Sequence, residues 1–100
     1  MILEHAEFAV TDGPAFEAAV TEALPLFLSS PGCHGVSLHR VIEAPGRYRL
    51  LVRWATIEDH TDRFRGSDAF PRWRALVSRF FAEAPVVTHL ESAVAGGDAP

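Results

Sequence analysis

Several features that this 100-residue chain lacks exclude whole classes of protein. Cys33 is its only cysteine, so no internal disulfide can form, and a lone thiol suits a reducing compartment. No apolar run approaches the length of a membrane span, and the first residues lack the basic region and long apolar stretch of a signal peptide. These absences predict a cytoplasmic protein with no membrane-spanning segment.

Cofactor motifs are also missing. The chain has no CxxC pair, no Gly-rich phosphate loop and no Rossmann fingerprint, and its histidines match no recognised metal motif. Its net charge of −4 argues against nucleic acid or an anionic membrane surface as the main partner. We therefore expect no bound cofactor or metal.

Apolar residues, in contrast, are plentiful. They make up 48% of the chain, against 22% charged residues, and the mean hydropathy is +0.09. A chain this short forms one small domain, which leaves a large share of its residues at the surface. The apolar surplus indicates that a partner covers part of that surface.

The clearest structural signal is a β-hairpin. Strand-like residues at Gly35–Glu43 and Tyr48–Ala55 flank Ala44-Pro45-Gly46-Arg47, and Pro-Gly suits the centre of a type II turn because glycine accepts the positive φ. The second strand alternates, with Tyr48, Leu50, Val52 and Trp54 on one face and Arg47, Arg49, Leu51 and Arg53 on the other. We therefore predict that this hairpin forms the centre of a sheet with one apolar face.

Periodicity predicts the other elements and the fold class. They are a strand over Ile2–Val10, a helix from Pro14 to about Ser30, a short helix after Thr56, a longer helix from Ser67 or Asp68 to about Ala82, and a strand over Val86–Ala93. The order β-α-β-β-α-β predicts a ferredoxin-like α+β fold, an antiparallel sheet with helices on one face. One domain spans residues 1–94, and residues 95–100 are expected to be a flexible tail.

Local signals refine two of the helices. Thr56 and Asp59 form a capping-box pattern, in which each side chain meets the backbone N–H of the other residue, and Gly66 ends the short helix. Pro25, inside the first helix, predicts a kink or a tightened final turn.

The uncovered face of this sheet is predicted to mix apolar and charged side chains. It should carry Leu3, Val41, Leu51 and Val87 together with His5, Glu7, His39, Arg49, Arg53, His89 and Glu91. Such a face is best buried against a second copy, which predicts a homodimer. His5 and His89 on this face are interpreted as a structural hydrogen-bond network, because their spacing matches no metal motif.

The chain resembles the antibiotic biosynthesis monooxygenase family of dimeric α+β barrel proteins. The resemblance lies in ILEHAEFAV, LPLFLSSPG, RYRLLVRW, Trp54 followed by His60, and the segment from Ser67 to Trp73, and it covers about residues 2–92. It implies dimers that pack their sheets into a shared barrel, with a pocket between sheet and helices in each protomer.

The family is functionally mixed. Some members oxygenate aromatic polyketides without metal or flavin, and others have no known activity. Haem-degrading members use an Asn, a Trp and a haem-ligating His, which fall on Ala6, Phe64 and Arg74 here, so none of the three matches.

Two charged residues interrupt the helix-facing side of the predicted sheet. Glu4 could act as a base at the pocket mouth and Arg40 could hold an anionic oxygen beside it. The alternative is a structural ion pair or two solvated strand ends. His60 is a second candidate base, because its pKa suits neutral pH, although a histidine near a helix start can also be a capping residue.

Aromatic residues provide candidate walls for a flat ligand: Phe8, Trp54, Phe70 and Trp73. The same residues can equally form an ordinary core. The resulting hypothesis is a cofactor-independent monooxygenase of a phenolic or quinol-like aromatic substrate. The alternatives are a non-enzymatic protein that binds small molecules or responds to stress, and a polyketide cyclase or isomerase on the same fold.

Overall fold

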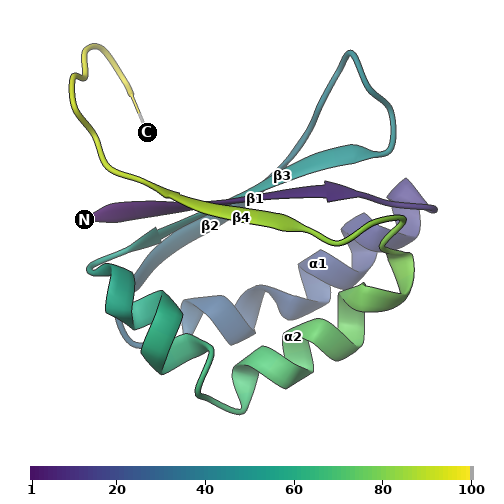
Figure 1. The fold of residues 1–100 in the computed structure, drawn as a ribbon, viewed down its shortest axis with the longest axis horizontal. Coiled ribbons are helices and arrows are strands. Elements are labelled where there is room, and N and C mark those ends of the chain that lie inside the picture. The colour runs from purple at the N-terminus through teal and green to yellow at the C-terminus, as the bar shows by residue number, and fades with distance from the viewer. Residues whose placement is uncertain (100) are drawn as a thin grey trace.

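Four antiparallel strands form a single sheet in the computed structural model, which describes residues 1–99 (Figure 1). The strands are β1 (Ile2–Ala9), β2 (Cys33–Arg40), β3 (Arg47–Trp54) and β4 (Val86–Leu90), and they lie in the order β2-β3-β1-β4. This is the strand order of a ferredoxin-like α+β fold, so the predicted fold class is confirmed. Residues 91–99 carry no helix or strand, and Pro100 lies outside the described residues.

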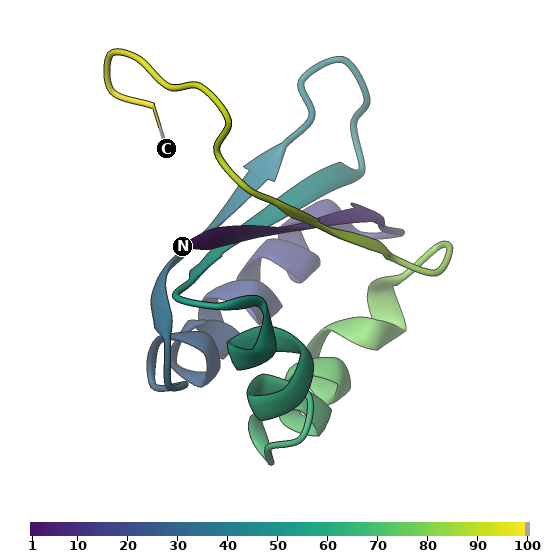
Figure 2. The same ribbon diagram turned by 60° about the vertical axis from the view of Figure 1, so that its left-hand side comes forward.

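The helices cover one face of the sheet, as both ribbon views show (Figures 1 and 2). They are α1 (Gly13–Leu28), a π-helix η1 (Asp59–Phe64), α2 (Ala69–Val77) and a 3₁₀ turn η2 (Ser78–Phe80). Among residues 1–99, no helix has both the length and the apolar character needed to cross a bilayer.

Helix α2 ends five residues before the predicted Ala82. The reason is a backbone contact with the end of β1: Phe81 forms a bridge with Val10, and the Ala82 N–H donates to the Ala9 carbonyl at 2.8 Å. This pairing draws the chain out of the helix after Val77.

The predicted hairpin turn is present. Gly46 has a φ of +87°, and the Arg47 N–H donates to the Ala44 carbonyl at 3.0 Å. Strand β2 ends at Arg40, so Val41 lies beyond the sheet. Helix α1 continues through Pro25, and its last turn tightens because the Ser30 N–H bonds to the carbonyl three residues earlier, at 2.9 Å.

The core lies between the sheet and the helices. Its buried side chains are Ala6, Phe8, Tyr48, Leu50, Val52 and Trp54 from the strands and Phe16, Ala19, Val20, Ala23, Phe27, Phe64, Trp73 and Val77 from the helices. The face of β3 predicted to be apolar is therefore the buried one.

The predicted orientation of β4 is wrong. Glu4 pairs with His89 and Ala6 with Val87, so His89 and Val87 face the helices, whereas His5 lies on the opposite side of the sheet. A shift of one residue turns every side chain of a strand over, and β4 has no alternation of polarity to specify its face. The proposed network between His5 and His89 is therefore also wrong.

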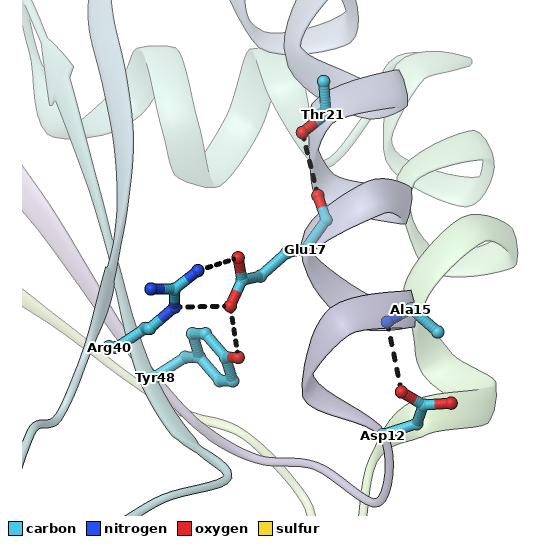
Figure 3. A network of polar contacts seen from close by, with 6 residues as sticks. All are labelled: Asp12, Ala15, Glu17, Thr21, Arg40 and Tyr48. Atoms are coloured by element: carbon cyan, nitrogen blue, oxygen red, sulfur yellow. Dashed lines mark hydrogen bonds and ion pairs between the residues drawn. The ribbon is translucent and has the colours of Figure 1, made fainter.

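Arg40 joins α1 to the sheet through an ion pair (Figure 3). Its Nε and Nη2 atoms donate to the two carboxylate oxygens of Glu17 at 2.7 Å each, and the Tyr48 hydroxyl donates to Glu17 Oε2 at 2.6 Å. These hydrogen bonds, chiefly those from Arg40, lower the pKa of Glu17 to about 2. Arg40 therefore forms a structural ion pair, but its partner is Glu17 of α1 and not Glu4.

Replacing Glu17 by Gln should lower the urea midpoint at pH 7 by a small amount, since the Arg40 side chain is 73% exposed and water screens the pair. The contribution of a carboxyl with a lowered pKa is complete above pH 4.5 and lost as pH falls toward 2. The difference in urea midpoint between Glu17→Gln and the wild type should therefore become smaller as the pH falls from 4.5 toward 2. Glu22→Gln on the same helix is the control, and equal effects of the two changes would contradict the role of the pair.

Candidate active site

A buried carboxylate lies on the helix-facing side of the sheet. The exposed fraction of Glu4 is only 5%, and its Oε1 atom accepts a hydrogen bond from Trp54 Nε1 at 3.0 Å. His60 Nε2 lies 3.3 Å from the same oxygen, and His60 is 3% exposed. The structure therefore brings together two of the three predicted catalytic residues.

His60 is held in place by the turn that begins its helix. The capping box is present: the Asp59 N–H donates to Thr56 Oγ1 at 3.2 Å, and the Thr56 N–H donates to Asp59 Oδ2 at 3.1 Å. Gly32 lies against Asp59, the residue before His60. It has a φ of +83°, and a Cβ atom there would lie only 2.1 Å from the Asp59 carboxylate, so only glycine fits. The residue next to His60 is thus fixed by its own cap and by the loop before β2.

The helix that carries His60 is widened. In η1 the Arg65 N–H donates to the His60 carbonyl at 3.1 Å, a spacing of five residues. Such π-helical turns occur frequently at functional sites. This turn places His60 and Phe64 inside, while the exposed Arg65 side chain still reaches the rim of the cavity described below.

His89 is a member of the site that the sequence analysis missed. Its Nε2 atom lies 2.8 Å from His60 Nδ1. Because Glu4 and His89 are paired neighbours on β1 and β4, the register brings the second histidine to the same end of the sheet. The residue type was visible in the sequence, but its face depended on the register of β4.

A cavity of about 330 Å³ opens beside Glu4 and His60. Its size falls at the lower end of the range of small-molecule sites. The walls are mainly aromatic and apolar, with two arginines: Ala6, Phe8, Leu50, Phe64, Arg65, Phe70, Trp73, Arg74, Phe81, Pro85 and Val87. The site therefore suits a small flat molecule with at least one polar or anionic group.

Three of the four predicted aromatic wall residues line this cavity, namely Phe8, Phe70 and Trp73. Trp54 does not. It is fully buried behind Glu4, and its ring stacks on His60 with a centroid distance of 5.7 Å and an interplanar angle of 21°. Trp54 thus orients the two polar residues without itself forming a wall.

The expectation that Arg40 shares the pocket with Glu4 is wrong. Arg40 lies on the edge strand β2, level with Tyr48 and Phe8, and is bound to Glu17. Alternation gave its face correctly, but it could not show that a helix carboxylate lies opposite. The cations at the cavity are Arg65, which follows η1, and Arg74, which lies in α2.

Burial has opposite effects on the two polar residues. It raises the pKa of the Glu4 carboxyl, although the Trp54 hydrogen bond and the positive charge of Arg65 act in the other direction. It lowers the pKa of His60 to about 4, and the positive charge of Arg65, with that of His89 when it is protonated, adds to that effect. At neutral pH, the contact between Glu4 and His60 therefore involves a neutral imidazole and is a polar contact rather than an ion pair.

The site does not have the form of a metal centre. Within residues 1–99, no group of three or more His, Cys, Asp or Glu side chains could hold a metal ion. The three positions that correspond to the haem-degrading residues, Ala6, Phe64 and Arg74, do line the cavity. Their side chains include no imidazole to bind haem iron.

Known proteins are similar to this chain in sequence and in fold. The family profile described as antibiotic biosynthesis monooxygenase matches residues 1–76. The uncharacterised protein YczJ of Bacillus subtilis (strain 168) is 38% identical over 93 residues, which cover 91% of this chain and 98% of YczJ.

Solved structures agree with this assignment. A Bordetella bronchiseptica protein that carries the name of the same family is 48% identical, with 93% of this chain and 97% of that chain covered and a TM-score of 0.90. A variant of SnoaB, a cofactor-independent oxygenase from Streptomyces nogalater, has a TM-score of 0.81 at 16% identity over 94% of each chain, a likeness of fold alone. The profile match over residues 1–76 establishes that this chain belongs to the antibiotic biosynthesis monooxygenase family.

Proposed function

We propose that the protein is a cofactor-independent monooxygenase that acts on a small phenolic or quinol-like aromatic substrate, with Glu4 as the general base. The observation that carries the proposal is a buried carboxylate, held by Trp54 and His60, at the wall of an aromatic cavity. A base with a raised pKa is suited to removing a proton near neutral pH.

The chemistry needs only the substrate, O₂ and a base. Glu4 removes a proton from the activated C–H or O–H group, and the resulting electron-rich anion transfers electrons to O₂. Carbon–oxygen bond formation and protonation give a hydroperoxide, and loss of water then leaves a carbonyl group. One oxygen atom enters the product and the other leaves in water, so O₂ is reduced and the substrate carbon is oxidised.

Oε2 is the Glu4 oxygen that remains for the substrate. Both contacts found for this carboxylate in the described chain involve Oε1. Arg65 and Arg74, at the cavity wall, stabilise the negative charge that develops on the substrate oxygen. The aromatic walls place the ring and exclude water from the anion.

We further propose that the protein works as a cytoplasmic homodimer whose uncovered sheet faces pack together. Leu3 and Leu51 are half-buried on that face, and Leu90 is 46% exposed. Arg49 pairs with Glu7 there at 3.5 Å, so the face offers both signs of charge to a second copy. The hollow lined by Leu3, Leu51 and Arg53, about 280 Å³, would receive side chains of the partner.

Replacing Glu4 by Gln should reduce the turnover of an anthrone-type substrate by ~10²–10⁴-fold, the usual contribution of a general base. Glutamine has nearly the same side-chain shape as glutamate and can still accept the Trp54 hydrogen bond, so the variant should fold. Turnover is followed as O₂ uptake, with thermal melts alongside.

Arg40→Met is the matched control for the Glu4 change, because it removes the charged residue that lies outside the cavity. It should retain nearly the wild-type rate. A wild-type rate in Glu4→Gln, or an equal loss in Arg40→Met, would contradict the proposed site. Turnover without O₂ would instead indicate a cyclase or isomerase, and binding without turnover would indicate a binding protein.

The pH profile provides a separate prediction. Activity requires the Glu4 carboxylate, so kcat/KM should rise with pH, and its acid limb should lie above pH 4.5 because burial raises the carboxyl pKa. Trp54→Phe removes a hydrogen bond that favours the carboxylate and should move the limb to still higher pH. The residual activity of Glu4→Gln should lack this limb, and an unmoved limb in Trp54→Phe would count against Glu4 as the base.

Leu51→Glu should dissociate the dimer or make the protein insoluble, because it places a charge in the middle of the proposed interface. Obligate dimers bury roughly 2,000 Å² or more in total. Light scattering gives the mass of the wild type and the variant, with Ile42→Glu, in the exposed turn after β2, as the control. A monomeric wild type would end this proposal.

A further inference from the structure

His89 is half-buried on β4, an edge strand of the sheet, and the reaction proposed above does not use it. It contacts His60 and is absent from the cavity wall. We propose that His89 is the outer end of a proton relay that links the Glu4 carboxyl, through His60, to solvent. The inference rests on the proposed function, because it assigns a proton route to the same base.

The relay consists of two contacts in series. His60 Nε2 lies 3.3 Å from Glu4 Oε1, and His60 Nδ1 lies 2.8 Å from His89 Nε2. Across residues 1–99, no other partner is found for either ring nitrogen of His60. With His60 only 3% exposed, a proton that moves between Glu4 and water along this path must pass through His89.

Two arrangements of protons fit these contacts. When Glu4 is ionised, His60 Nε2–H donates to Oε1, His89 Nε2–H donates to His60 Nδ1, and His89 Nδ1 has a free lone pair. When Glu4 has taken a proton, a half-turn of its carboxyl group brings the protonated oxygen to the Oε1 position, where its hydroxyl donates to His60 Nε2. His60 Nδ1–H then donates to His89 Nε2, and His89 Nδ1 carries a proton.

The two arrangements differ by one proton at the outer end. Three transfers convert the arrangement with protonated Glu4 into the arrangement with ionised Glu4. The Oε1 proton moves to His60 Nε2, the His60 Nδ1 proton moves to His89 Nε2, and His89 releases its Nδ1 proton to water. Each imidazole gains one proton and loses one, so only Glu4 changes its charge. The reverse sequence delivers a proton from water to Glu4.

The surrounding charges favour this exchange. Arg65 is the cation that acts on Glu4, His60 and His89 alike, and together with burial it lowers the pKa of both histidines. Both rings are therefore neutral near pH 7, and a neutral imidazole can accept a proton at one nitrogen while it gives one up at the other. A charged ring could only donate.

A purely structural hydrogen bond is the competing explanation, and His89→Gln distinguishes it from a relay. A glutamine amide can donate to His60 Nδ1, but it cannot take a proton and pass it on. In weakly buffered solution, kcat for the aromatic substrate should fall about tenfold or more, less than for loss of the base itself. Added imidazole should restore the rate by carrying the proton in place of His89.

His34→Gln is the matched control, because His34 is exposed on β2 at the opposite edge of the sheet. It should turn over at the wild-type rate with or without imidazole. A wild-type rate in His89→Gln, or a loss that imidazole does not restore, would overturn the relay.

A second measurement needs no substrate. In ¹⁵N-labelled protein, the ring nitrogens of His60 and His89 should exchange protonated and unprotonated chemical shifts together as Glu4 titrates. In Glu4→Gln, that joint change should disappear. Independent behaviour of the two rings in the wild type would overturn the relay even if turnover is found, whereas a joint change in a protein that turns over no substrate would support the relay and refute the oxygenase.

Discussion

The burial of one carboxylate, Glu4, is the constraint on which the site depends. Leaving an unpaired charge in a protein interior costs about 3–5 kcal/mol, so the chain must supply partners. Trp54 donates a ring N–H to Oε1, and His60 Nε2 lies 3.3 Å from the same oxygen. Their rings stack, and the packing that holds the aromatic core together therefore also holds the polar pair.

Separate parts of the fold serve this arrangement. The hairpin carries Trp54 into register beside the start of β1, the capping box and Gly32 fix the turn before His60, and β4 adds His89 from the outer edge. Each of these local features is common in proteins. They form a site only because the fold brings the hairpin, the turn before His60, the loop at Gly32 and β4 together. A buried carboxylate in an aromatic cavity supports the proposed oxygenation, in which the substrate supplies the reducing electrons.

The two charged residues on the helix-facing side of the sheet have different roles because of what lies opposite them. Arg40 faces a carboxylate on α1 and serves the fold, as its bidentate pair shows. Glu4 faces the indole N–H of Trp54, the neutral ring of His60 and a cavity, and both contacts are with Oε1, which leaves Oε2 without a contact in the described residues. The positive charge of Arg65 also favours the ionised form of Glu4, because it acts to lower the pKa of the carboxyl.

The sequence alone determined the order of elements, the hairpin turn, the capping box and the buried faces of β1 and β3, because each depends on local chemistry or strict alternation. It also indicated Glu4, His60, Phe8, Phe70 and Trp73 as members of one site. Only the tertiary structure decided the face of β4, the π-helical turn, the place of Arg65 and Arg74 at the cavity, and the partner of Arg40. These depend on strand register and on which helix lies opposite a given strand, and neither is encoded in a local pattern of residues.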